Sequence, residues 1–198
     1  LEIQVAGQAS YPAWSRRTGM PVPAITQDLE EPSQFVKEGC TVLVPILIII
    51  FLIAINGFFV AAEFAIAATP RTQAAQMAES GSAAAQHVLK TLRDQTLMNR
   101  YISTAQVGIT IASLGLGMYG ERVIAHWLLH PLESLGWFGT AMAHTIATLI
   151  AVSILTYLHV VVGEMVPKSL ALQSAASTAA RLSRPMTIAE RLFRPLTA

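Results

Sequence analysis

The sequence has little charge and almost no cysteine. Only 13% of its 198 residues are Asp, Glu, Lys or Arg and 53% are hydrophobic, whereas charged residues make up about 25% of an average soluble domain. A surface with so few charges cannot face water over most of its area, so we expect a membrane protein. The single cysteine, Cys40, excludes a disulfide framework within the chain and is interpreted as an ordinary thiol.

Several classes of function lack their signatures. The net charge is +1 and no basic stripe exceeds the flanks of the apolar runs, which argues against a nucleic-acid partner. The sequence contains no nucleophile elbow, no HExxH pair and no phosphate-cradling glycine loop. We therefore expect no enzyme activity and no organic cofactor. A membrane enzyme that uses Glu63, His159 and Glu164 as acid and base is the least favoured alternative.

Residues 1–40 differ from the rest of the chain. They are rich in proline and show neither helical nor alternating periodicity, which predicts an extended N-terminal arm. The pair Arg16 and Arg17 suggests a twin-arginine signal, but the first apolar run begins too far downstream for that interpretation.

Three apolar runs predict transmembrane helices, at about residues 41–68, 102–119 and 140–162. The first run carries two strongly polar side chains, Asn56 and Glu63, which lie two helical turns apart on one face. The second run is rich in small residues, which favours close helix packing, and it places Gln106 and Thr110 on one face. Polar groups at this depth face protein or water, so these side chains indicate interhelical hydrogen bonds or a site.

The connecting segments predict helices that do not span. Thr69 and Pro70 end the first helix, and residues 71–100, divided by Gly81, predict a helical hairpin on the membrane surface. Residues 169–198 predict an amphipathic C-terminal helix. The expected fold is an all-α membrane protein with three transmembrane helices, a membrane-surface helical hairpin and an amphipathic C-terminal helix.

Residues 120–139 predict a turn region between the second and third spans. Trp127 and Trp137 suggest that this region lies at a membrane interface. His126 and His130 are one turn apart, but no third metal ligand is near them in the sequence, so we interpret both as solvated or interfacial.

The distribution of positive charge orients the three spans. Lysines and arginines gather between the first two spans and after the third, whereas the loop between the second and third contains only Arg122. By the positive-inside rule, the N-terminus is outside and the C-terminus is cytoplasmic. Glu63 and Glu164 then both lie toward the cytoplasmic side.

The stretch from Gly163 to Lys168 ends the last apolar run. Gly163 leaves the backbone uncovered, and Pro167 cannot donate to the carbonyl four residues before it, so a broken helix end beside Glu164 is suited to hold a cation. The alternative is an ordinary helix end with Glu164 and Lys168 paired at the interface. With Asn56 and Gln106 nearby, two carboxylates at one depth would form an oxygen-rich pocket for a hard divalent cation.

These residues carry a resemblance to a known family. The segments NGFFVAAEFAIA at 56–67, STAQVGITIASLGLGMYGE at 103–121 and VVGEMVPKSLA at 161–171 occur in the order and spacing of the CNNM/CorC family of magnesium transporters. Residues 41–198 together resemble the transmembrane domain of that family. The resemblance implies a bacterial inner-membrane homodimer whose cavity binds magnesium as the transported substrate, with export coupled to sodium entry in some members.

The resemblance also implies a set of metal ligands. Gly163 and Glu164 match the family, and Asn56 stands where members often have serine. Val60 and Ile109 are apolar where members often have further oxygen ligands, so Gln106 and Thr110, on adjacent turns, are the candidates to replace them. The family usually continues into cytoplasmic CBS nucleotide-binding modules, which are absent from this chain.

Two functions from different classes therefore remain. The first is a divalent-cation transporter domain with a metal site at Asn56, Gln106, Thr110, Gly163 and Glu164. The second is a non-transporting structural subunit that has kept the three-helix scaffold and docks with other subunits in a larger membrane complex.

Overall fold

The computed structural model describes residues 32–134 and 139–197, and the side chains of residues 42–134 and 139–195. The chain divides into two compact units, residues 1–42 and 43–198, and the second unit is described below. The expected arm at residues 1–40 lies mostly outside the described residues. Its last part, from Pro32 onward, is not extended but belongs to the first described helix.

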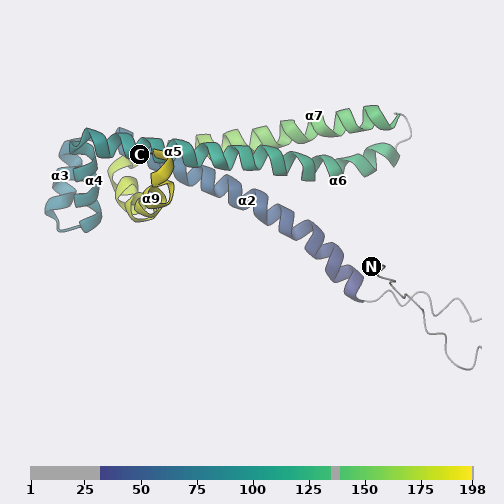
Figure 1. Ribbon diagram of the computed structural model, residues 1–198, viewed down its shortest axis with the longest axis horizontal. Coiled ribbons are helices and arrows are strands. Elements are labelled where there is room, and N and C mark those ends of the chain that lie inside the picture. The colour runs from purple at the N-terminus through teal and green to yellow at the C-terminus, as the bar shows by residue number, and fades with distance from the viewer. Residues whose placement is uncertain (1–31, 135–138, 198) are drawn as a thin grey trace, which may run out of the picture. The chain divides into compact units, whose positions relative to one another are not determined.

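The described residues form helices and no strands, as the sequence predicted (Figure 1). In chain order they are α2 (Pro32–Ala68), α3 (Arg71–Glu79), α4 (Ala83–Arg93), α5 (Gln95–Gly115), the π-helical η2 (Leu116–Gly120), α6 (Glu121–Ser134), α7 (Thr140–Leu158), the π-helical η3 (His159–Met165), α8 (Val166–Gln173) and α9 (Ala175–Thr197). Three continuous helical stretches are long and apolar enough to cross a membrane, at Val42–Ala68, Gln95–Ser134 and Thr140–Gln173. The prediction of three spans is confirmed.

The helical hairpin after the first span forms as expected. α2 ends at Ala68, directly before Thr69 and Pro70, and α3 and α4 follow with Gly81 between them. Gly81 has a φ of 86°, a conformation that costs glycine little and other residues much. Asp94 then caps α5, because its Oδ1 accepts from the backbone N–H groups of Thr96 at 2.8 Å and Leu97 at 3.3 Å.

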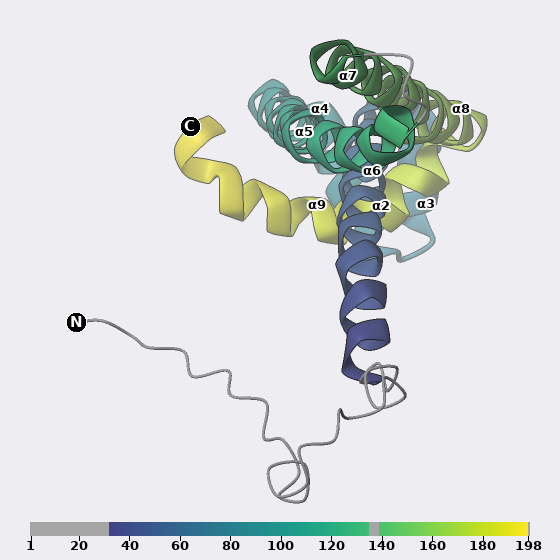
Figure 2. The same ribbon diagram turned by 90° about the vertical axis from the view of Figure 1, so that its right-hand side faces the viewer.

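The prediction of a turn region at residues 120–139 is wrong for residues 120–134, which are helical. The second span continues through η2 into α6 as far as Ser134, and residues 135–138, with Trp137, lie outside the described residues. Gly120 does not bend the chain. It is buried, and a Cβ atom there would lie 2.9 Å from Leu155 Cδ1, so this glycine allows α7 to approach closely. α6 and α7 accordingly run side by side in both views (Figures 1 and 2).

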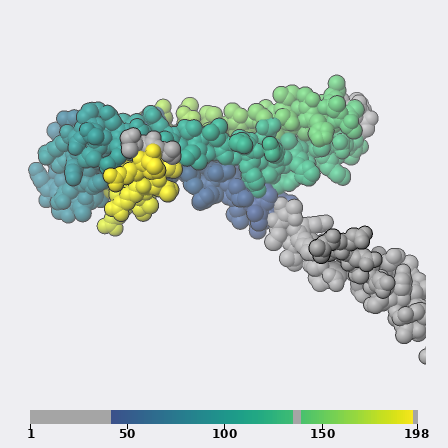
Figure 3. All heavy atoms as spheres, in the orientation of Figure 1, coloured from purple at the N-terminus to yellow at the C-terminus, as the bar shows by residue number. Residues whose placement is uncertain are grey.

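The core is built from small residues and a few large ones. Its main cluster joins the end of α2 to α3, α4, α5, α8 and α9, and Figure 3 shows α9 lying against this part of the molecule. The buried members are Phe59, Ala62, Ala65, Ile66, Ala74, Val88, Leu92, Tyr101, Ala105, Ala171, Ala179 and Met186. Alanine at so many contacts lets the helices come close together. A second cluster of Ile49, Leu116 and Leu155 joins the three spans.

Candidate functional site

The centre of the candidate site is a contact between the first and third spans. Asn56 on α2 is 1% exposed, and its Nδ2 donates to the backbone oxygen of Gly163 in η3 at 2.9 Å. Pro167 explains why this oxygen needs a donor, because proline has no N–H to offer the carbonyl four residues before it. The sequence predicted a freed carbonyl at this point, and the structure shows a side-chain amide bound to it.

The backbone does not break at Gly163, contrary to the expectation of a broken helix end. The π-helical η3 widens the helix over one turn and leads directly into α8. Such π-helical turns are frequently found at functional sites. Two glycines allow the spans to meet here: a Cβ atom at Gly163 would lie 3.3 Å from Asn56 Nδ2, and one at Gly57 would lie 2.9 Å from Pro167 Cγ.

The second span contributes a serine that extends this contact. Ser113 Oγ lies 3.2 Å from Asn56 Oδ1 and 3.2 Å from His159 Nε2. Asn56 Oδ1 can only accept, so the Ser113 hydroxyl donates to it and accepts from an Nε2–H of His159. The hydrogen bonds therefore form a chain with one direction: His159 donates to Ser113, Ser113 donates to Asn56, and Asn56 donates to the Gly163 oxygen. We call these four residues the polar relay.

Glu164 lies beside the polar relay in the sequence. Its side chain is half-buried and has no hydrogen bond or ion pair within the part of the chain that the structure describes. The expected alternative, a pair with Lys168, does not form: Lys168 Nζ lies instead over the ring of Phe64, 4.2 Å from its centroid. A carboxylate without a partner is available to a cation, and this one belongs to the residue that follows Gly163.

Gln106 and Thr110 occupy a different place from Asn56. Both are exposed on α5; Gln106 Nε2 is 3.5 Å from Glu63 Oε1, and Thr110 Oγ1 donates to the backbone oxygen of Gln106 at 2.8 Å. Of the five predicted ligands, the structure thus brings Asn56 and Gly163 into contact, with Glu164 adjacent in the chain. The roles of all five as metal ligands stay predictions.

Sequence reasoning missed the role of Ser113 and of His159 beside Asn56. A signal was present for each: Ser113 lies two helical turns after Gln106, on the same side of α5, and His159 lies one turn before Gly163. Val60 and Ile109, the two apolar positions within the expected ligand set, are packed as hydrophobic residues. Val60 is 2% exposed, and Ile109 packs against the main core cluster.

Histidines elsewhere do not form a metal centre. His126 and His130 are both exposed on α6. Within residues 42–134 and 139–195, no group of three or more His, Cys, Asp or Glu side chains is arranged to hold a metal ion. A cation site here would need backbone and amide oxygens, which is the chemistry of hard cations such as magnesium.

Comparison with known proteins places the chain in a family. Residues 47–198 match the model of the cyclin M transmembrane N-terminal domain. The chain belongs to this family. The cyclin M transmembrane domain is known as the membrane part of proteins related to divalent-cation transport, a transporter-type family rather than an enzyme family.

Curated bacterial proteins resemble this cyclin M transmembrane domain over most of its length. The UPF0053 protein YhdP of Bacillus subtilis is 37% identical over 153 residues, which cover 77% of this chain and 34% of YhdP. YhdT of the same organism is 37% identical over 145 residues, 73% of this chain and 30% of YhdT. An uncharacterized Mycobacterium tuberculosis protein is 37% identical over 157 residues, 79% of this chain and 43% of that protein. The chain therefore spans about a third of the length of such relatives.

Proposed function

We propose that this chain is the membrane domain of a divalent-cation transporter, with magnesium as the transported substrate. The observation that carries the proposal is the Gly163 oxygen, which Pro167 cannot serve as α-helical donor and which Asn56 holds; the next residue, Glu164, has a carboxylate without a partner among the described residues. Magnesium binds oxygen ligands and keeps several waters. Asn56, Gly163 and Glu164 supply an amide, a backbone and a carboxylate oxygen. Gln106 and Thr110 are exposed elsewhere on α5, where Gln106 lies near Glu63, so they would reach the cation only after a rearrangement.

The polar relay gives a physical route from a closed site to a cation-bound one. Rotation of the Asn56 amide by half a turn brings Oδ1 to the Gly163 oxygen, so that both can bind the cation. Nδ2 then donates to Ser113, whose hydroxyl donates in turn to His159 when the imidazole proton is on Nδ1. Two of the three hydrogen bonds of the relay reverse direction, and the third, from Asn56 Nδ2 to the Gly163 oxygen, is replaced by coordination of both oxygens to the cation.

The orientation of the proposed transporter follows from the distribution of basic residues, and its membrane and its oligomeric state follow from the family resemblance. We place the protein in the bacterial inner membrane with the N-terminus outside and the C-terminus cytoplasmic, because Arg and Lys gather between the first two spans, in α3, α4 and the start of α5, and after the third span, in α8 and α9. A homodimer formed through membrane helices and coupling to sodium are further parts of the proposal that the family resemblance supports.

A magnesium titration of the detergent-purified protein tests the proposal. We expect saturable binding, and a loss of at least about tenfold in affinity for Glu164→Gln, because the carboxylate supplies the charge that a hard divalent cation requires. Glu133→Gln is the matched control, since Glu133 is exposed on α6 and far from Gly163 in the sequence. Equal affinity of the wild type and both variants would contradict the proposed site.

The second candidate is a structural subunit in which the polar relay only clamps three helices together. Val60 and Ile109, apolar where the family often has oxygen ligands, favour it. Absence of magnesium binding, together with stable stoichiometric copurification of other membrane subunits, would select this candidate over the transporter.

A further inference from the structure

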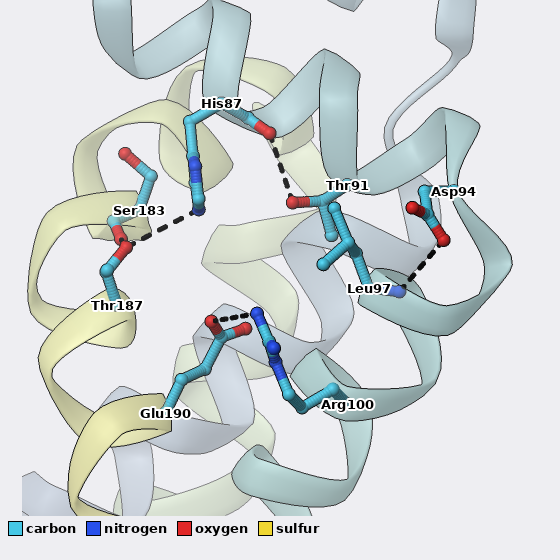
Figure 4. A network of polar contacts seen from close by, with 8 residues as sticks. All are labelled: His87, Thr91, Asp94, Leu97, Arg100, Ser183, Thr187 and Glu190. Carbon is cyan, nitrogen blue, oxygen red and sulfur yellow. Dashed lines mark hydrogen bonds and ion pairs between the residues drawn. The ribbon is translucent and has the colours of Figure 1, made fainter. Parts of the chain in front are cut away.

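A small cavity lies between α4 and α9, away from the polar relay. It has a volume of about 200 Å³ and is lined by Ala83, Ala84, His87, Ser183, Arg184 and Thr187. Figure 4 shows the His87 side chain reaching toward Ser183 and Thr187 from the opposite helix. The lining contains an arginine, a histidine and two hydroxyls but no carboxylate, so its charge is positive or neutral.

The hydrogen bonds fix which atoms can donate into this cavity. Thr187 Oγ1 donates to the backbone oxygen of Ser183 at 2.8 Å, so it accepts at its 3.4 Å contact with His87 Nε2. His87 therefore carries its proton on Nε2, at the cavity wall, and donates it to Thr187 over this long contact, so an anion in the cavity would take the N–H over from Thr187. Arg184 is exposed and has no hydrogen bond or ion pair among the described residues. Its guanidinium is free to bind a ligand.

The first turn of α4 adds to this positive character. α4 begins at Ala83, and Ser82 caps it by accepting from the Ala85 N–H at 3.4 Å. The N–H groups of Ala83 and Ala84 come before the first N–H that an α-helix can satisfy, and methyl side chains leave them accessible. An anion in the cavity would meet these donors together with His87 and Arg184.

We propose that this cavity binds a phosphate group, and that the group belongs to the headgroup of an anionic phospholipid. Arginine pairs with phosphate through two parallel hydrogen bonds, which a histidine N–H and backbone N–H groups can supplement. This binding site is separate from the cation site, and the inference does not depend on the proposed transport function.

The surface of α9 favours a lipid as the source of the phosphate. Ile188 and Leu192 are 68% and 70% exposed, and they lie one and two turns after Arg184 on the same side of the helix. An exposed apolar stripe next to arginine is typical of a helix that lies in the membrane interface, where the arginine meets the headgroups. Figure 3 shows α9 on the outside of the molecule, where lipid can reach it.

Titration of the detergent-purified chain with phosphatidylglycerol tests the inference, with phosphatidylcholine and inorganic phosphate in parallel. We expect saturable binding of phosphatidylglycerol and a Kd about tenfold higher for Arg184→Gln, since hydrogen bonds between charged groups are strong. His87→Leu should weaken binding as well. Arg181→Gln is the matched control, because Arg181 is exposed on α9 one turn earlier and does not line the cavity. Its Kd should stay within about twofold of the wild type.

The outcomes distinguish a lipid-headgroup site, a site for free phosphate, and the absence of a specific site. Binding of phosphatidylglycerol that depends on Arg184 but not on Arg181 supports the lipid headgroup. Equally selective binding of inorganic phosphate, without a preference for phosphatidylglycerol, keeps the phosphate site and overturns the lipid source. Equal losses in Arg184→Gln and Arg181→Gln would mean diffuse charge attraction, and no saturable binding would remove the site; either result overturns the inference. Unchanged thermal melting of the variants checks that they fold.

Discussion

Replacement of Gly108 by leucine is expected to prevent stable folding of this membrane domain. Gly108 is buried on α5, and a Cβ atom there would overlap the ring of Phe59 on α2. Phe59 is 7% exposed and lies within the main core cluster, with its ring centroid 5.0 Å from that of Phe58 and 6.3 Å from that of Phe193. The ring has no room to move, so we expect a cost of about 3 kcal/mol or more from overpacking.

The measurement is the unfolding midpoint of the detergent-purified protein, followed by intrinsic fluorescence. Gly117→Leu is the matched control, because Gly117 lies in the same continuous helix and a Cβ atom there would meet nothing within 4 Å. The double variant Phe59→Ala, Gly108→Leu should recover part of the lost stability, since the alanine makes space for the new side chain. A wild-type midpoint for Gly108→Leu alone would show that α2 and α5 do not pack as described.

Asn56 is expected to control the response of stability to magnesium. Asn56→Ala leaves the Gly163 oxygen without its side-chain donor, at a cost of about 1–3 kcal/mol, and also removes a proposed ligand. Asn56→Asp places acceptor oxygens and a negative charge against the Gly163 oxygen, so it should be less stable than the wild type without magnesium and gain more on its addition. A bound ligand at a hundredfold excess over its Kd stabilises by about 2.7 kcal/mol.

Unfolding midpoints with and without magnesium chloride measure this response. Asn99→Asp is the control for the aspartate variant, because Asn99 is exposed and its Oδ1 accepts only from Gln95 Nε2, at 3.0 Å, among the described residues. If Asn56 only clamps helices together, both variants at position 56 would lose stability and the magnesium response of Asn56→Asp would equal that of the wild type. That result would count against the cation site.

The ends of the helices could be predicted from the sequence where proline or glycine alone determines the local backbone conformation. Thr69 and Pro70 end the first helix, and Gly81, with its positive φ, divides the hairpin. The same kind of signal misled at Gly120 and Pro167, which suggest a turn and a break. At Gly120 the bare backbone makes room for Leu155 of α7 and the helix continues, and at Gly163, within the π-helical η3, Asn56 of α2 donates to the carbonyl oxygen that Pro167 cannot serve. Tertiary contacts decided both positions.

The features of the site that belong to single helices could be predicted from the sequence, whereas the contacts between helices could not. A carbonyl freed by Pro167 and a polar residue at Asn56 are properties of single helices, and the sequence indicates both. Which side chain of α5 meets Asn56 depends on how the helix is rotated and shifted against its neighbours. Gln106 and Thr110 have the more suitable chemistry, but Ser113 makes the contact. No pattern along one helix fixes that choice.

Nuclear magnetic resonance of side-chain amides tests the cation site most directly. Asn56 and Asn99 are the only asparagines in the sequence, so protein labelled with ¹⁵N at asparagine side chains gives two pairs of amide signals, one pair for each nitrogen, and the variant Asn99→Gln assigns them. We predict that magnesium shifts the Asn56 signal saturably, as its amide turns from the Gly163 oxygen to Ser113, while the Asn99 signal stays in place. An Asn56 signal that does not move at saturating magnesium, or that moves only in step with Asn99, would contradict a cation site between Asn56 and Gly163.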